Sequence, residues 1–393
     1  MKLLVNTTAL TPPLTGIGHY CSQLMLQLMD GARLDNIKGV SLSGTQLMDR
    51  AALEATIRQA QNGHAENAGA QLRGGWRNLA RQIPFARSVR RSLVKRCLSS
   101  KRAALDGYVY WEPNFLRLPV QLPSAVTIYD LSHHSHPEFH PSARVRLLEK
   151  GIARSVAGAD RVIAISEFTR QEVIRTFSLP PEKVALVQPA VSDAFRVEPT
   201  VEAMSALRLR YALPERFVLS VGTLEPRKNT IALMRAFAAL PADLRKSCPL
   251  VLVGGKGWHT HQIDADLTRL EQRGELIWLG YVPQSDMPLL YRAADAMAYV
   301  SLYEGYGMPV AEAMVSGTPV LTSDCTSMPE VAAGSALLVN PRDDEAVRDG
   351  LERILSDQLL RQQCIERGLK QADSYTWQNA GDQLMTVLRE LQN

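Results

Sequence analysis

Two glutamates stand close together in a glycine-containing stretch of the second half of the chain. Residues 304–312 read Glu-Gly-Tyr-Gly-Met-Pro-Val-Ala-Glu, so seven residues separate Glu304 from Glu312. Each carboxylate can accept hydrogen bonds from a vicinal pair of hydroxyls. Gly305 and Gly307 let backbone N–H groups approach phosphate oxygens, and the proline that follows suits the first turn of a helix, whose N-terminus favours anions. The spacing suits a sugar nucleotide, with one acid on each sugar and the diphosphate between them. An exposed helix start that carries two acids is the alternative.

Two adjacent cations lie upstream, in the run Gly222-Thr-Leu-Glu-Pro-Arg-Lys-Asn229. The run follows an apolar stretch typical of a strand and precedes a helical pattern, and ligands of open parallel sheets bind at the carboxyl ends of strands. Arg227 can hold two phosphate oxygens with its planar guanidinium, and Lys228 supplies a point charge. We therefore expect Gly222, Arg227 and Lys228 to lie against a diphosphate, with a solvated basic loop as the alternative.

The elements that must position these residues are clearest in the second half of the chain. Short apolar runs alternate there with segments of three- and four-residue apolar spacing, such as 229–240 and 262–273. This alternation predicts a parallel, doubly wound sheet. The expected strands lie at 217–221, 249–253, 276–279, 296–300, 319–322 and 336–339.

The first half of the chain repeats the same pattern more loosely. A helix with Tyr20, Leu24 and Leu28 on one face follows the first apolar run, and 393 residues suit two domains. We predict an α/β fold of two Rossmann-like doubly wound domains, residues 1–190 and 197–374, followed by a helix within 375–393. The strands expected in the first half lie at 3–5, 107–110, 125–128, 161–165 and 184–187.

Several motifs resemble, in order and spacing, those of the retaining glycosyltransferases of family 4, which have the GT-B fold. These motifs are the run 222–229, Gly280-Tyr-Val282, the stretch 301–319 around the two glutamates, and Pro329-Glu-Val331. The resemblance implies two Rossmann-like domains facing a cleft, with the final helix crossing back to the first domain. It also implies a retaining hexosyl transfer that needs no metal ion and no cofactor. The donor would bind the second domain, and the acceptor would bind the first.

The same resemblance implies roles for individual residues. Arg227 and Lys228 would stabilise the charge that grows on the leaving phosphate, Glu304 would hold the transferred hexose, and Glu312 would hold the ribose. With Asp130, the first three are the predicted catalytic residues. Donor contacts are also expected at Gly16, Gly18, Gly222, Val282, Gly305, Tyr306, Gly307 and Met308.

One position departs from the family pattern. Family members commonly have His-Asp where this chain has Tyr129-Asp130, and their histidine faces the reacting sugar. Asp130 ends an expected strand and should face the cleft. Four of the eight histidines lie at 133–140, and one of them could compensate for Tyr129. A metal site is the alternative, but no thiolate or carboxylate spacing supports it.

The first half also carries a strongly basic segment, residues 73–102, with ten Lys and Arg and no acid. Residues 1–195 hold 24 Lys and Arg against 15 Asp and Glu, whereas the remainder holds 20 against 25. Apolar residues recur in the segment at helical spacing, so it suits an anionic membrane surface. A solvated helix and a nucleic-acid site are the alternatives, but no aromatic ladder or DNA-binding motif accompanies the patch, and we expect no nucleic-acid partner.

Composition narrows the function further. No apolar run approaches the roughly 20 residues of a membrane span, and the five cysteines are scattered. We expect a cytoplasmic protein that docks on the inner face of the membrane. Bacterial polysaccharide and O-antigen enzymes with a similar 222–229 run often use GDP-mannose, so we expect that donor and a lipid-linked or oligosaccharide acceptor. Other GDP-, UDP- or ADP-sugars remain open, as does a non-catalytic sugar-nucleotide-binding or membrane-docking protein.

Overall fold

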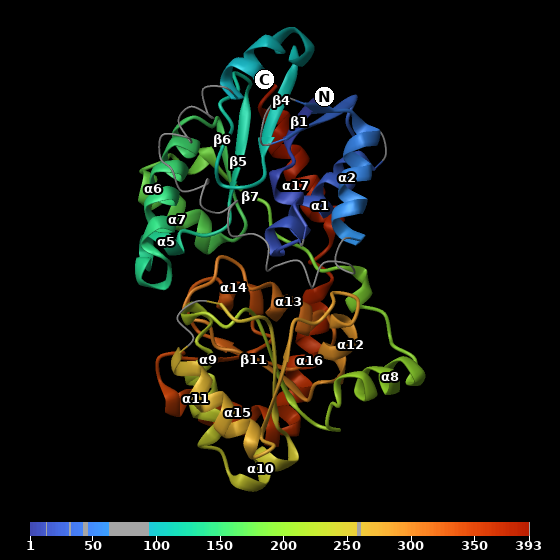
Figure 1. Cartoon of the computed structure of the whole chain (residues 1–393), viewed down its shortest axis with the longest axis vertical. Helices are drawn as coiled ribbons and strands as arrows, with labels where there is room; N and C mark the ends of the chain where they lie inside the picture. Colours follow the sequence, from blue (N-terminus) through green and yellow to red (C-terminus); the bar gives the residue numbers. More distant parts are fainter. Residues whose placement is uncertain (13, 31–32, 42–45, 63–93, 258–260, 393) are drawn as a thin grey trace.

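The chain forms two lobes stacked along its long axis, each built around one β-sheet (Figure 1). This computed structural model describes residues 1–12, 14–30, 33–41, 46–62, 94–257 and 261–392, with the backbone alone at 62 and 261–265. The two parallel sheets with helices around them confirm the predicted α/β fold of two Rossmann-like domains.

The sheet of the first domain has the strand order β3-β2-β1-β4-β5-β6-β7 among the described residues. All neighbours pair in parallel except β2 and β3, which are antiparallel. The sequence pattern did not predict β2 and β3, because β2 reads Asn-Ile-Lys-Gly-Val and β3 has two residues. The strands are β1 (Lys2–Asn6), β2 (Asn36–Val40), β3 (Leu47–Met48), β4 (Tyr108–Glu112), β5 (Ser124–Ile128), β6 (Arg161–Ala164) and β7 (Val184–Leu186).

The helices of the first domain position its loops at the carboxyl ends of the strands. The helix α1 buries Tyr20, Leu24 and Leu28, as its spacing predicts. The very short α5 follows β5 and lies at the edge of this domain that faces the second (Figure 1). The helices of this domain include α1 (Gly16–Met29), α2 (Arg50–Asn62), α5 (Ser132–Ser135), α6 (Ser142–Ala157) and α7 (Glu167–Phe177), and residues 94–100 are also helical.

The sheet of the second domain is parallel throughout, in the order β10-β9-β8-β11-β12-β13. The strand order reverses between β8 and β11, which is the point where open α/β sheets bind ligands. All six predicted strands are present. They are β8 (Val218–Val221), β9 (Leu250–Val253), β10 (Leu276–Gly280), β11 (Ala296–Tyr299), β12 (Val320–Ser323) and β13 (Leu337–Val339).

The helices of the second domain flank this sheet, and the last helix of the chain returns to the first domain. That helix, α17 (Trp377–Glu390), packs against α1 and β5 and buries an apolar face that includes Leu384 and Leu388 (Figure 1). No helix in the described ranges is long and apolar enough to cross a bilayer. The remaining helices are α8 (Val201–Tyr211), α9 (Thr230–Ala238), α10 (Ala242–Ser247), α11 (His261–Gln272), α12 (Met287–Ala293), α13 (Met308–Val315), α14 (Met328–Ala332), α15 (Asp344–Ser356) and α16 (Gln358–Ala372).

The two domains meet through the loops that follow their strands. The hydroxyl of Tyr303, beyond β11, contacts Glu172 on α7 and accepts a hydrogen bond from the Leu131 N–H, beyond β5, at 3.1 Å. Glu330 on α14 accepts hydrogen bonds from the first backbone N–H groups of α7, at Glu167 (2.8 Å) and Phe168 (3.1 Å). A carboxylate from one domain therefore caps a helix of the other.

Candidate active site

The predicted cations and one predicted acid form a single buried cluster in the second domain. Arg227 and Lys228 lie in the 3-10 turn η7 (Pro226–Lys228), directly after β8, and Glu304 lies in the loop after β11. Arg227 Nη1 is 2.7 Å from Glu304 Oε2, and Lys228 Nζ is 2.6 Å from Glu304 Oε1. Glu304 lies 77 positions after Arg227 and 76 positions after Lys228 in the chain. These residues meet because β8 and β11 are neighbours in the sheet.

Two further residues complete this cluster, and neither was predicted. Arg227 Nη2 is 2.8 Å from Glu225 Oε1, and the Tyr299 hydroxyl at the end of β11 donates to Glu304 Oε1 at 2.8 Å. Lys228 also contacts the Tyr299 hydroxyl. Glu225 lies within the run 222–229, where an acid close to two cations in the sequence could have indicated an ion pair. Tyr299 was hidden, because it ends an apolar strand.

The cluster fixes the charge of its groups. Burial opposes ionisation of Glu304, but Arg227 and Lys228 lower its pKa to about 2. Burial lowers the pKa of Lys228, and Glu304 opposes that shift. The pKa of Arg227 is raised, because Glu304, Asp130 and Glu225 outweigh the burial that would lower it. Two cations and two carboxylates thus balance in this cluster, where an incoming diphosphate would compete with the carboxylates for the cations.

Glu312, the second predicted acid, is in a different environment. It lies in the middle of α13 and is half-buried, and its Oε2 accepts a hydrogen bond from the Tyr291 hydroxyl of α12 at 2.8 Å. Burial raises the pKa of Glu312 to about 7, against that hydrogen bond. The two acids that the sequence presents alike therefore differ, because Glu304 is held ionised by cations whereas Glu312 has one neutral donor.

Gly305 is the point of closest approach between the domains. A Cβ on Gly305 would lie 1.8 Å from the carbonyl oxygen of Tyr129. The Gly305 carbonyl accepts hydrogen bonds from Ser166 Oγ at 2.6 Å and Thr169 Oγ1 at 3.1 Å. Glycine at position 305 therefore allows the close contact between the domains, which the sequence did not predict. An approach of this backbone to phosphate remains a prediction.

The rest of this loop is packed rather than open. Gly307 has φ +106° and precedes α13, and a Cβ there would meet Met328 Cε at 2.2 Å. Tyr306 is buried, and its hydroxyl donates to the Pro189 carbonyl at 3.3 Å. Met308 begins α13 and packs on the core. The side chain of Tyr306 therefore contributes to the domain contact. The predicted contact of Tyr306 with the sugar-nucleotide donor would have to be made by its backbone.

A small pocket lies where β8 and β9 end. Gly222, Lys228 and Tyr299 are among its lining residues, together with Ser220, Thr230 and Val253. It adjoins the cation cluster, because Lys228 and Tyr299 belong to both. Val282, beyond β10, is 5% exposed and belongs to the hydrophobic core, so its side chain is not presented to this pocket.

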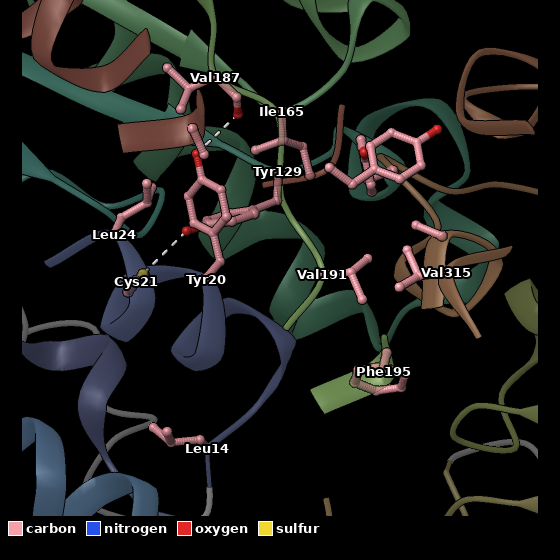
Figure 2. Packing of buried hydrophobic residues seen from close by; sticks show 14 of the residues in the cluster. Leu14, Tyr20, Cys21, Leu24, Tyr129, Ile165, Val187, Val191, Phe195 and Val315 are labelled. Atoms are coloured by element: carbon pink, nitrogen blue, oxygen red, sulfur yellow. Dashed lines mark hydrogen bonds between the residues drawn. The ribbon is translucent and has the colours of Figure 1, made fainter. Parts of the chain in front are cut away.

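On the first domain, the side chain of Tyr129 points away from the second domain. Its hydroxyl donates to the Pro113 carbonyl at 2.6 Å and lies 3.3 Å from Cys21 Sγ. Its ring packs edge-on against Tyr20 (Figure 2). It also packs edge-on against Phe115. The hydroxyl of Tyr129 is therefore held inside the first domain and is not presented to the second.

Asp130 and the glycines near the start of α1 are the other predicted residues of this domain. Asp130 borders the domain contact, since its Cβ lies 3.0 Å from the position of a Cβ on Gly305. Gly16, the first residue of α1, faces open space, whereas a Cβ on Gly18 would meet the Ala9 carbonyl oxygen at 2.8 Å. Gly18 is thus explained by packing, and ligand contact at Gly16 remains a prediction.

The basic segment lies largely outside the described residues, which exclude 73–93. Residues 94–100 are helical, with Val94 and Leu98 in the core and Lys95 and Arg96 exposed. This part has the amphipathic character that the spacing predicts.

Comparisons with known proteins identify the family. The model described as "Glycosyl transferases group 1" matches residues 209–371, and "Glycosyltransferase Family 4" matches residues 68–195. The chain is 33% identical over 392 residues to the O-antigen chain mannosyltransferase B of Escherichia coli, and the match covers 100% of both chains. The chain belongs to glycosyltransferase family 4. A second relative, the serotype-specific mannosyltransferase WbdA of Escherichia coli, is 33% identical over 226 residues, covering 56% of this chain and 28% of WbdA.

Solved structures show the same fold as this glycosyltransferase. The Anabaena protein HepE in complex with UDP-glucose superposes with a TM-score of 0.71 at 17% identity, covering 99% of this chain and 100% of that one. WaaG, a glycosyltransferase involved in lipopolysaccharide biosynthesis, superposes with a TM-score of 0.67 at 16% identity and 99% coverage of both chains. The GT-B fold that the resemblance implied is thereby confirmed. The family model and the full-length relative confirm the assignment to a hexosyltransferase enzyme.

Proposed function

We propose that this glycosyltransferase moves mannose from GDP-mannose, with retention of configuration, onto a lipid-linked or oligosaccharide acceptor in polysaccharide biosynthesis. The observation that carries the proposal is the Arg227–Lys228–Glu304 cluster beside the domain contact. The sugar is inferred from the full-length relative, which is named an O-antigen chain mannosyltransferase.

In the proposed mechanism, the two cations act on the leaving group. As the bond between the sugar and the phosphate breaks, negative charge grows on the phosphate oxygens. Arg227 and Lys228 stabilise that charge more than they stabilise the ground state, which lowers the barrier. The donor phosphate replaces Glu304 as a partner of the two cations. Glu304 is then available to hold hydroxyls of the transferred hexose. The ionised state of Glu304 suits this role, because a carboxylate without its proton accepts hydrogen bonds at both oxygens.

Glu312 is proposed to hold the ribose hydroxyls of the donor. Calorimetric titration of GDP-mannose into the wild type and Glu312→Ala tests this role, with weaker binding expected in the variant. Equal affinity would remove the ribose from Glu312. A thermal-shift screen across GDP-, UDP- and ADP-sugars tests the donor itself, because a ligand that binds only the folded chain raises its melting temperature. A larger shift with another sugar nucleotide would replace GDP-mannose.

We also propose that the basic segment 73–102 docks the enzyme on an anionic membrane surface, where a lipid-linked acceptor would be presented. Ten cations without an acid support this proposal, at roughly 1 kcal/mol for each cation near the surface. Flotation with vesicles that contain anionic phospholipid should recover the protein at low salt, and recovery should fall as salt rises. Binding that does not depend on salt or on anionic lipid would leave the segment as a solvated face.

A further inference from the structure

Tyr303 belongs to the second domain, but its ring and hydroxyl contact residues of the first. It lies in the loop after β11, directly before Glu304, and is 1% exposed. Its ring packs edge-on against the rings of His136, with 5.5 Å between centroids, and Phe168, with 5.7 Å. His136 follows α5 and Phe168 lies in the first turn of α7, so two segments of the first domain hold the ring. The proposed mechanism gives this tyrosine no role.

The hydroxyl of Tyr303 is held by the first domain in a defined direction. The Leu131 N–H can only donate, and it lies 3.1 Å from the Tyr303 oxygen, which therefore accepts. The phenol proton is left for Glu172 on α7, whose Oε2 contacts the hydroxyl. The other oxygen of Glu172 accepts a hydrogen bond from Ser135 Oγ at 2.8 Å. Hydrogen bonds on the hydroxyl and edge contacts on the ring thus fix Tyr303 relative to the first domain.

The main chain of Tyr303 contacts the cation cluster of the second domain. Arg227 Nη1 donates to the Tyr303 carbonyl at 2.9 Å, and the same nitrogen is 2.7 Å from Glu304 Oε2. The Arg227 carbonyl in turn accepts a hydrogen bond from the Leu302 N–H at 2.9 Å. Tyr303 therefore joins two contacts. Its side chain reaches the first domain, and its carbonyl holds a cation that is proposed to act on the leaving phosphate.

Donor binding would change only part of the surroundings of Arg227. In the proposed mechanism the donor phosphate takes the place of Glu304, whereas Glu225 and the Tyr303 carbonyl remain. The Glu225 carboxylate holds Nε at 3.2 Å and Nη2 at 2.8 Å, and the carbonyl holds Nη1. A guanidinium is planar and rigid, so partners at both ends fix its orientation. The place of the Tyr303 carbonyl thus helps to set where Arg227 points while charge grows on the phosphate.

The second domain itself supports the residues that follow Tyr303. Ser327 Oγ donates to the carbonyls of Glu304 at 3.0 Å and Tyr306 at 2.7 Å. These contacts lie within one domain, so they do not depend on how the two domains meet. Tyr303 differs, because its side chain takes its partners from the first domain.

We propose that Tyr303 is a positioning residue that makes the orientation of Arg227 depend on the contact between the two domains. While the first domain holds the phenol ring, the Tyr303 carbonyl holds the guanidinium where it can meet the leaving phosphate. When the domains separate, the ring loses these partners and the carbonyl is no longer fixed from the first domain. The inference rests on the proposed function, because it assumes that Arg227 acts on that phosphate.

The proposal predicts that cleavage of the donor by water also depends on Tyr303. In that reaction the anomeric carbon gains a hydroxyl from water, and GDP leaves with the electron pair of the broken bond. If Tyr303 acts through Arg227, hydrolysis and transfer should fall by the same factor when the phenol hydroxyl is removed. If Tyr303 only held the domains together, a looser contact would admit water, and hydrolysis would be kept or would rise while transfer fell.

The matched variants are Tyr303→Phe and Tyr375→Phe. Both remove a hydroxyl from a buried tyrosine, but that of Tyr375 donates to the carbonyl of Val331 on α14. With GDP-mannose as donor and a synthetic mannosyl oligosaccharide as acceptor, transfer should fall about tenfold in Tyr303→Phe, and so should GDP release without acceptor. Tyr375→Phe should keep both wild-type rates, with a melting temperature similar to that of Tyr303→Phe. Wild-type rates in Tyr303→Phe, or a fall in transfer with hydrolysis unchanged, would overturn the proposal.

A cycle with Arg227→Lys tests whether Tyr303 acts through the guanidinium. Lysine keeps the charge, but its single terminal nitrogen cannot reproduce the two-ended hold of the planar group. In the Arg227→Lys background, Tyr303→Phe should therefore lower donor cleavage by less than about twofold. A further fall of about tenfold, as independent effects would give, would show that Tyr303 acts by another route.

Glu172→Ala tests the same link from the first domain and leaves the second unchanged. It removes one partner of the Tyr303 hydroxyl, so hydrolysis and transfer should fall together, and the double variant with Tyr303→Phe should be no slower than Tyr303→Phe alone. Wild-type rates in Glu172→Ala, or additive losses in the double variant, would reject the link. Failure of the wild type to cleave GDP-mannose would instead reject the proposed donor, and the comparison would then use the sugar nucleotide that raises the melting temperature.

Discussion

The two sides of the domain contact differ in how their chemistry is held. On the second domain, Arg227 and Lys228 bind Glu304 directly, so charged groups separated by 76 and 77 positions form one cluster. On the first domain, Tyr129 is turned into the core, where its hydroxyl donates to the Pro113 carbonyl. The proposed donor side, on the second domain, thus depends on charge, whereas the first domain depends on the direction in which a side chain points.

Lys228→Ala should produce the largest loss of turnover, because it removes a cation from the proposed donor side. A hydrogen bond to a charged group contributes about 1.5–3 kcal/mol, so turnover should fall at least about tenfold and up to about 100-fold. The initial rate of transfer from GDP-mannose measures this effect. Lys246→Ala, which removes an exposed cation from α10 of the same domain, is the control. Wild-type turnover in Lys228→Ala would show that this charge does not act on the leaving phosphate.

Gly305→Ala should produce the next largest loss of turnover, because it forces the two domains apart where they are closest. A Cβ 1.8 Å from the Tyr129 carbonyl oxygen cannot be accommodated without movement of the loop or of the domains. A misplacement of about 1 Å can cost about 100-fold in rate, so turnover should fall at least about tenfold, with a lower melting temperature. Rate and thermal unfolding are measured together.

Gly255→Ala is the control for stability, since a Cβ there meets nothing within 4 Å. If Gly305→Ala kept the wild-type rate and melting temperature, the close approach of the domains would not matter for catalysis.

The sequence predicted the second domain better than the first for physical reasons. All six strands of the second sheet are apolar runs, and such runs are visible without knowledge of the fold. In the first sheet, β2 contains Lys38 and Gly39, so the apolar pattern is weak. The sequence predicted Arg227, Lys228 and Glu304 from their charge and their positions after strands, and the structure brings the three together. Their contact with a donor stays a prediction. The burial of Tyr129 was not predictable, because a tyrosine after a strand can point to either side of the sheet.

Two glutamates with raised pKa values, the buried Glu112 of the first domain and the half-buried Glu312 of the second, sharpen the comparison through their dependence on pH. Burial raises the pKa of Glu312 to about 7, and it does the same for Glu112. A carboxyl whose pKa is higher in the folded chain stabilises the fold at low pH, and this contribution is lost as pH rises through about 7. Glu312 has one donor, Tyr291, whereas Glu112 accepts hydrogen bonds from Asn6, Tyr110 and the N–H groups of 114 and 118.

Glutamine should therefore be tolerated at 312 and not at 112. At about pH 8, Glu312→Gln should raise the free energy of unfolding, by at most about 3 kcal/mol, because no buried charge remains. Glu112→Gln should lower it by about 1–3 kcal/mol, because an amide N–H group would face donors that need an acceptor. Urea unfolding at about pH 5 and about pH 8 measures both variants. Equal effects of the two substitutions would show that the number of donors does not distinguish the sites.

Tyr129→Phe should give the smallest effect, and it tests the direction of the side chain directly. The substitution removes the hydrogen bond from the Tyr129 hydroxyl to the Pro113 carbonyl and leaves the ring packed against Tyr20 and Phe115. The free energy of unfolding should fall by about 1 kcal/mol, since a neutral hydrogen bond contributes about that much. Because the hydroxyl lies in the core, kcat and the acceptor KM should stay at wild-type values, as judged by steady-state kinetics beside urea unfolding. A tenfold fall in kcat with unchanged stability would place the Tyr129 hydroxyl on the substrate.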